Sequence, residues 1–197
     1  MQKTRNVGIL IFEDVEVLDF CGPFEVFSVA GRQIVPGAFN VFTIAKTPDA
    51  VVARNGLSVN PKTTLAEAPA IDLLLIPGGI GTRPLVHDAE LLKWIQDRAQ
   101  SAERVLSVCT GALLLGKAGL LDGLSATTHH GAFDLLREMA PRTTVLDDRR
   151  VVDNGRVITS AGIAAGIDMS LHVVAKLLGV ETAQATARYM EYPWVPG

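Results

Sequence analysis

The sequence is poor in cysteine, carries little net charge and contains no long apolar run. Its two cysteines, Cys21 and Cys109, are too few for a disulfide scaffold and lack the paired spacing of a zinc site. The formal net charge is −3 and like charges do not cluster, which argues against a surface for nucleic acid or anionic lipid. No stretch approaches the ~18 consecutive apolar residues of a membrane-spanning helix. We therefore expect a cytoplasmic protein in a reducing compartment, without nucleic acid or membrane as partner.

The chain is long enough for one domain with a sizeable core. Of its 197 residues, 48% are hydrophobic and 20% are charged, as in ordinary globular proteins. A domain of this length buries ~70% of the surface of its unfolded chain, so it needs neither a metal nor a disulfide for stability. The sequence shows no internal repeat and no linker rich in proline, glycine or serine. Residues 1–197 are therefore predicted to form a single domain.

Apolar segments typical of buried strands alternate along the chain with segments of helical periodicity. Strands are predicted over residues 6–12, 39–45, 57–60, 71–76, 104–108 and 126–129. Helices are predicted over residues 23–30, 89–99, 110–117, 132–139, 168–178 and 181–190, with Pro23 in the first turn of the first helix. Asn154-Gly155 indicates the turn of a hairpin. The pattern predicts an α/β fold, a mostly parallel sheet with helices on both faces and a small antiparallel hairpin.

The most informative segment is Ser107-Val108-Cys109-Thr110-Gly111, where a predicted buried strand meets a predicted helix. A sharp turn there would form a nucleophile elbow with cysteine as the nucleophile, at the carboxyl edge where open α/β sheets bind ligands. The helix N-terminus would lower the pKa of the thiol, and Gly111 would allow close packing. The alternative is a buried structural cysteine, because free cysteines are often buried.

A second segment, residues 77–81, ends the preceding strand with a proline and three glycines. The amides of Gly78 and Gly79 could face a tetrahedral oxyanion together with the amide of Thr110. No Walker motif and no complete dinucleotide fingerprint accompanies these glycines. The alternative is an ordinary turn after a strand.

Asp19 stands between Leu18 and Phe20, shortly after the first predicted strand. An acid in such a place is either a helix cap or a buried carboxyl group with a raised pKa. Because its loop is expected at the same sheet edge as Cys109, general acid–base catalysis is the functional alternative to capping.

His129 and His130 follow another predicted strand. A histidine beside a cysteine suggests a thiolate–imidazolium pair, whereas a histidine at a strand end is more commonly only hydrogen-bonded. No His, Cys and carboxylate cluster has the spacing of metal ligands, so no metal site is predicted.

Several motifs occur in order along nearly the whole chain, and together they resemble the ThiJ/PfpI superfamily. These motifs are residues 9–23, 73–79, 107–111, 126–129 and 159–162. Asp19, Gly22 and Pro23 match a Leu-Asp-x-x-Gly-Pro motif of the isonitrile hydratase-like branch, and Thr110 is typical of it. The resemblance implies a flavodoxin-like three-layer sandwich and a homodimer.

The resemblance also implies a cofactor-independent mechanism on a small-molecule substrate. Cys109 would attack the terminal carbon of an isocyanide, Asp19 would transfer protons, and water would release an N-substituted formamide. Thr110, Gly78 and Gly79 would stabilise the intermediate. Ile163 is expected in the pocket lining from its position. Cys21 departs from the pattern, because hydratase relatives place a threonine there.

Two other functions use the same residues. A cysteine hydrolase, amidase or glyoxalase-type enzyme would need His129 as a general base. A non-enzymatic redox sensor or ligand-binding domain is the other alternative, since the same domain precedes a helix-turn-helix domain in some AraC-like regulators. Here the sequence closes at Gly197 without such a domain, so we do not expect DNA binding.

Overall fold

The computed structural model of the chain describes residues 3–196. A seven-stranded sheet lies at its centre, in the order β10-β11-β7-β6-β1-β2-β5. Every neighbouring pair in this sheet is parallel except the β10–β11 hairpin. The strands of this sheet are β1 Arg5–Leu10, β2 Phe39–Ala45, β5 Thr63–Thr64, β6 Leu73–Ile76, β7 Arg104–Val108, β10 Val151–Asp153 and β11 Val157–Ser160. The mostly parallel α/β fold with one hairpin is confirmed.

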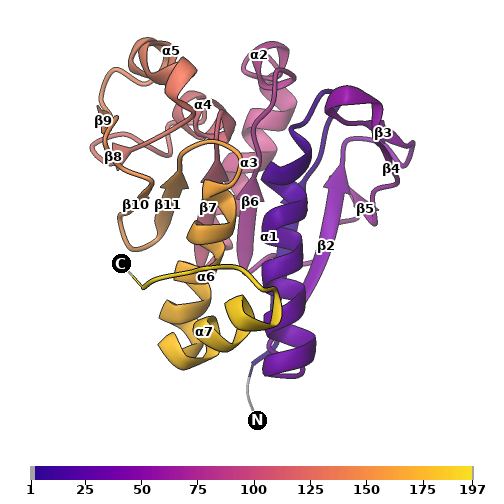
Figure 1. Cartoon of the computed structure of the whole chain (residues 1–197). Helices are drawn as coiled ribbons and strands as arrows, with labels where there is room; N and C mark the ends of the chain where they lie inside the picture. The colour runs from indigo at the N-terminus through magenta and orange to yellow at the C-terminus, as the bar shows by residue number, and fades with distance from the viewer. Residues whose placement is uncertain (1–2, 197) are drawn as a thin grey trace.

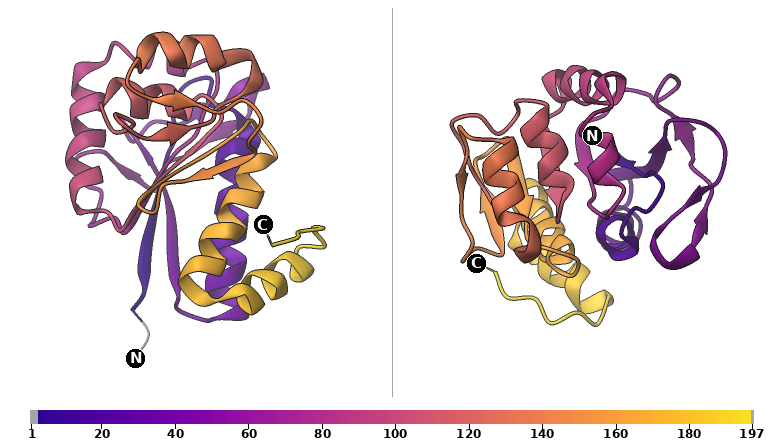
Figure 2. Two further views of the ribbon diagram at one scale, coloured as in Figure 1. Left: turned by 90° about the vertical axis from the view of Figure 1, so that its left-hand side faces the viewer. Right: turned by 90° about the horizontal axis from the view of Figure 1, so that it is seen from above.

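Helices cover both faces of the sheet, as Figures 1 and 2 show. The long helices α1, α6 and α7 lie on one face, and α3 and α4 lie on the other. The helices are α1 Val17–Val29, α2 Thr82–Leu85, α3 Ala89–Ser101, α4 Gly111–Lys117, α5 Phe133–Met139, α6 Ala165–Leu178 and α7 Val180–Tyr189. In the part of the chain that the structure describes, none of them has both the length and the apolar character required to cross a membrane.

The core lies between these layers. All four residues of β6 are 0% exposed, because parallel strands are covered on both faces and their side chains are apolar in both directions. The hairpin turn occurs where Asn154-Gly155 predicts it, with Gly155 at a φ of 82°. Asp88 caps the start of α3, its side chain accepting a hydrogen bond from the amide of Leu91.

The predicted start of the first helix is wrong. Helix α1 begins at Val17 and contains Pro23 in its interior, although an internal proline costs about 3 kcal/mol because it lacks an N–H donor. Packing against α6 offsets this cost: Gly22 lies so close to Ile167 that a β-carbon there would be 2.9 Å from its side chain. Tertiary contact thus extends the helix through residues that local rules assign to a loop.

Two predicted strands lie outside the main sheet and are shorter than predicted. The strand expected at residues 57–60 is β4 Ser58–Val59, which pairs with β3 Val51–Val52 outside the main sheet. The strand expected at residues 126–129 is only β8 Ser125–Ala126, paired with β9 Thr144–Val145. It ends early because Thr127 and Thr128 make hydrogen bonds toward β11 and the turn after β7 instead of toward a neighbouring strand.

Candidate active site

Cys109 lies at the carboxyl end of β7, in the sharp turn that leads into α4. Its φ is 55°, a left-handed conformation that is rare for a residue with a side chain and typical of a strained elbow. Its amide hydrogen faces the carbonyl oxygens of Ser160 and Ala161, each 3.2 Å away. The predicted elbow is therefore present, and its cysteine is 5% exposed.

Gly111 makes this turn possible. A β-carbon at Gly111 would overlap the carbonyl oxygen of Ile76, at the end of the neighbouring strand β6. The first turn of α4 therefore packs directly against the sheet, and only glycine fits this close approach.

Asp19 lies in the first turn of α1 and is fully buried. It is not the helix cap, because Glu16 occupies that position and makes no capping bond through its side chain. The amide of Gly78 donates to its Oδ2 at 2.9 Å, whereas Oδ1 has no hydrogen-bond partner in the described chain. Burial raises the pKa of Asp19 to about 7, the charge of Glu16 adds to this effect, and the bond from Gly78 opposes it.

The same surroundings raise the pKa of the Cys109 thiol, whereas the sequence predicts a lowered pKa. Burial, followed by the nearby charge of Asp19, raises the pKa of Cys109 to about 12. The amide and hydroxyl of Thr110 oppose the shift but do not overcome it. The expected low pKa is therefore wrong, because burial of the thiol and the nearby carboxyl group of Asp19 outweigh the groups at the start of α4 that favour the thiolate.

Gly78 and Gly79 support the site in another way than expected. Their amides donate to Asp19 and to Thr110 Oγ1 (3.0 Å), so neither points freely at an oxyanion. A β-carbon at Gly78 would lie 2.5 Å from the Thr110 nitrogen. The two glycines thus hold the side chains that flank Cys109.

Thr82, in α2, completes this hydrogen-bond network. Its fully buried hydroxyl lies 2.8 Å from the Gly79 carbonyl oxygen and 3.2 Å from Thr110 Oγ1. Arg83 Nη1 in turn donates to Thr82 Oγ1 at 2.9 Å and to the Gly79 oxygen at 3.3 Å. Thr110 is therefore fixed from several sides next to the sulfur.

A pocket of about 140 Å³ opens onto Cys109. It is lined by Glu16, Gly79, Ile80, Arg83, Cys109, Thr110, His129 and Ile163. The structure thus brings together the predicted residues Cys109, Thr110, His129, Ile163 and Gly79, with Asp19 beneath them. Glu16 and Arg83 were not predicted, because neither belongs to a recognisable motif and the short helix α2 carries no periodic signal.

His129 lines this pocket, and its ring accepts a hydrogen bond from the backbone. Its Nδ1 accepts a hydrogen bond from the amide of Gly131 at 3.1 Å, which places the ring hydrogen of the neutral form on Nε2. Burial and the neighbouring His130 lower the pKa of His129, which favours that neutral form. In this tautomer the ring has no free nitrogen lone pair for a general base.

Cys21 does not line the pocket. It follows Asp19 by two positions on α1, so the two side chains leave opposite sides of the helix. Cys21 is half-buried against the core, and both cysteines are free thiols.

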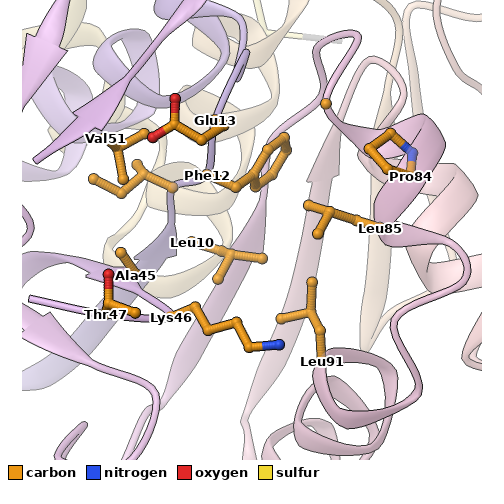
Figure 3. A pocket seen from close by; sticks show the side chains of 12 residues that line it. Leu10, Phe12, Glu13, Ala45, Lys46, Thr47, Val51, Pro84, Leu85 and Leu91 are labelled. Atoms are coloured by element: carbon orange, nitrogen blue, oxygen red, sulfur yellow. The ribbon is translucent and has the colours of Figure 1, made fainter. Parts of the chain in front are cut away.

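A second, apolar cavity of about 230 Å³ lies nearby (Figure 3). Leu10, Phe12, Leu85 and Leu91 form much of its wall, and it contains no cysteine or histidine. We therefore place the candidate active site at the smaller pocket. Among residues 3–196, no three His, Cys, Asp or Glu side chains are grouped to hold a metal ion.

Comparison with known proteins adds the family context. The chain matches the model of the DJ-1/PfpI family over residues 5–176. It is 40% identical over 191 residues to an isonitrile hydratase of Pseudomonas putida, covering 97% of this chain and 80% of that protein. It is 27% identical to the HTH-type transcriptional regulator GbdR of Pseudomonas aeruginosa, covering 97% of this chain but 52% of that protein.

Solved structures agree with this match. A THiJ/PfpI family protein from Pseudomonas syringae has a TM-score of 0.88 at 32% identity, covering 99% of this chain and 78% of that chain. Drosophila melanogaster DJ-1beta has a TM-score of 0.84 at 20% identity, covering 97% of this chain and 100% of that chain, a likeness of fold alone.

Proposed function

The chain belongs to the DJ-1/PfpI family, and we propose that it is an isonitrile hydratase, which adds water to an isonitrile to give an N-substituted formamide. The proposal assigns Cys109 as the nucleophile, Asp19 as the proton-transfer group and Thr110 as the group that orients the reacting atoms. It needs no cofactor. We further propose a cytoplasmic homodimer, as the family resemblance implies.

The observation that carries the proposal is the buried pair of Asp19 and Cys109. A carboxyl group with a pKa of about 7 exchanges protons readily at neutral pH, which suits a group that must act as both base and acid. Its unpartnered Oδ1 is available for that exchange. Hydration of an isonitrile needs both proton uptake and proton release next to a nucleophile, and the pair supplies both.

In the first step, the Cys109 sulfur forms a bond to the terminal carbon of the isonitrile. Asp19 accepts the thiol proton and delivers it to that carbon, which gives a thioimidate. The raised pKa of Cys109 fits this order of events, because the thiol keeps its proton until the substrate is present. The amide of Thr110, close to the sulfur, orients the reacting thiol.

In the second step, water adds to the same carbon. Asp19 takes a proton from the water and delivers it to the nitrogen, which gives a tetrahedral intermediate that carries a hydroxyl group. The intermediate then collapses: the carbon–sulfur bond breaks, Asp19 takes the hydroxyl proton and returns it to the sulfur, and the N-substituted formamide leaves. The net reaction consumes one isonitrile and one water.

A cysteine hydrolase is the second candidate, because His129 lines the same pocket as Cys109. The hydrogen bond from Gly131 to Nδ1 weighs against it, since a general base needs a free nitrogen facing the substrate. A ligand-binding role is supported only by the likeness to regulators such as GbdR.

Turnover of a simple aryl isonitrile tests the proposal. We expect the wild-type protein to form the formamide, and Cys109→Ala to form none while keeping the wild-type thermal unfolding temperature. Absence of formamide with the folded wild-type protein would contradict the hydratase assignment, and hydrolase substrates would be the next to assay.

A further inference from the structure

Arg83 is the cation of the pocket that contains the nucleophile. It lies in α2 and lines the pocket together with Cys109 and Thr110. Its Nη1 is anchored by Thr82 Oγ1 and by the carbonyl oxygen of Gly79. This anchoring holds one edge of the guanidinium against the protein and thereby fixes the direction of the planar group.

The rest of this guanidinium is unpaired. Within residues 3–196, no carboxylate lies within 4 Å of Arg83, and Nε and Nη2 make no hydrogen bond to the protein. Arg5 pairs with Glu103 at 2.8 Å, and Arg150 pairs with Asp168 at 2.5 Å. Other arginines, such as Arg98 and Arg156, also lack a carboxylate partner, but they bond to backbone carbonyl oxygens and do not line the pocket of Cys109. A half-buried arginine with an anchored edge and a free edge is arranged to bind an anion.

Glu16 is the other charged group that lines the pocket, and it makes no ion pair with Arg83. An anionic ligand would be attracted by Arg83 and repelled by Glu16. The position of the negative charge on the ligand would therefore affect how well the ligand binds. Replacing Arg83 removes a positive charge from the pocket and replacing Glu16 removes a negative one, so the two substitutions should have opposite effects on anion binding.

We propose that Arg83 is a specificity residue that binds a carboxylate group on the substrate. The inference rests on the proposed function, and it narrows the substrate class to small isonitriles with an acidic group near the isonitrile carbon. The pocket volume of about 140 Å³ limits the size of the molecule. Exposed Ile80 and Ile163 would contact its apolar part.

The test compares isocyanoacetate with isocyanoacetamide, which have nearly the same shape but differ in charge. For the wild-type protein we expect a higher kcat/KM for the carboxylate than for the amide. Arg83→Gln should lower the ratio of the two kcat/KM values about tenfold, and Glu16→Gln should raise it. Arg188→Gln, an exposed position on α7, makes the same change of net charge away from the pocket and should keep the wild-type ratio.

Alkylation of Cys109 separates this inference from the hydratase proposal. Iodoacetate and iodoacetamide differ by the same charge, and peptide mass spectrometry distinguishes Cys109 from Cys21. Arg83→Gln should lower the iodoacetate-to-iodoacetamide rate ratio at Cys109 about fivefold, with Arg188→Gln again as the control. If no isonitrile is converted but this ratio falls, the hydratase proposal fails while the anion site stands. If Arg83→Gln unfolds like the wild-type protein and changes neither ratio, the anion site is wrong.

Discussion

The buried hydroxyl of Thr128 donates a hydrogen bond of 2.7 Å to the carbonyl oxygen of Cys109. This bond joins the segment after β8 to the elbow, whose left-handed cysteine costs about 1–2 kcal/mol in backbone strain. The elbow thus keeps its conformation through contacts from a distant part of the chain.

Thr128→Val should therefore destabilise the protein and weaken the hold on the turn at Cys109. We expect a loss of about 1–3 kcal/mol in the free energy of unfolding, because the buried carbonyl loses a strong donor at little change in side-chain volume. Urea unfolding measures the loss. Thr182→Val is a control, since that hydroxyl lies in α7 and bonds to the carbonyl of Leu178 at the end of α6, far from the elbow. Equal stability of Thr128→Val and the wild type would contradict this role.

Asp19 should make stability depend on pH. Its pKa is about 7 in the folded protein against 3.8 for a free side chain, so between these values the folded state binds a proton that the unfolded state releases. The contribution of Asp19 therefore falls as pH rises from about 4 to 7, by roughly 4 kcal/mol in all. Urea unfolding at pH 5 and pH 8 should show the larger part of this fall in the wild type and a smaller change in Asp19→Asn. Parallel profiles of the two proteins would show that the carboxyl group is not buried in this way.

The charge of Asp19 also suppresses the thiolate of Cys109. Asp19→Asn removes that charge, so the pKa of Cys109 should fall from its raised value toward an ordinary one, although burial still opposes ionisation. Iodoacetamide should then alkylate Cys109 faster in Asp19→Asn than in the wild type at pH 8, with Cys21 in the same samples as an internal reference. A slower reaction would mean that Asp19 promotes ionisation of the thiol.

The sheet and the elbow could be predicted because local sequence determines them. The continuous apolar run of β6 and the Asn154-Gly155 turn each depend on a few adjacent residues. The start of α1 could not be predicted, since Pro23 is tolerated only through packing of Gly22 against Ile167. The short strand β8 ends where its next residues form hydrogen bonds to residues distant in the sequence, and no local sequence pattern predicts these bonds.

In the candidate site, too, some features could be predicted from the local sequence and others depend on the folded arrangement. Cys109 and Asp19 stand out because their residue types are unusual next to buried strands, and the sheet edge brings them together. The pKa of Cys109 could not be predicted, because it depends on the burial and charge that only the folded arrangement provides. Arg83 was missed because its proposed role depends on a charge without an ion-pair partner in a pocket. The sequence does not show which charged side chains form ion pairs in the fold.

Gly111 should tolerate no side chain. In Gly111→Ala the new methyl group would overlap the carbonyl oxygen of Ile76, so β6 and α4 would have to separate. We expect a loss of about 3 kcal/mol or more in the free energy of unfolding. Gly131→Ala is the matched control, because its nearest contact would be an ordinary 3.4 Å to the ring of His129. Equal unfolding midpoints for the two variants would contradict the close packing at the elbow.

The effect of replacing His129 should distinguish hydratase from hydrolase chemistry. His129→Asn removes a pocket donor, and because the ring nitrogen Nδ1 is already bonded to Gly131, turnover should fall less than about tenfold. Asp19→Asn removes the proposed proton-transfer group, which should lower kcat by about 100-fold or more. Measuring kcat for both variants on one isonitrile gives the comparison. If His129→Asn is the more damaging change, a histidine base drives the reaction, and Asp19 serves mainly to hold Gly78 against the elbow.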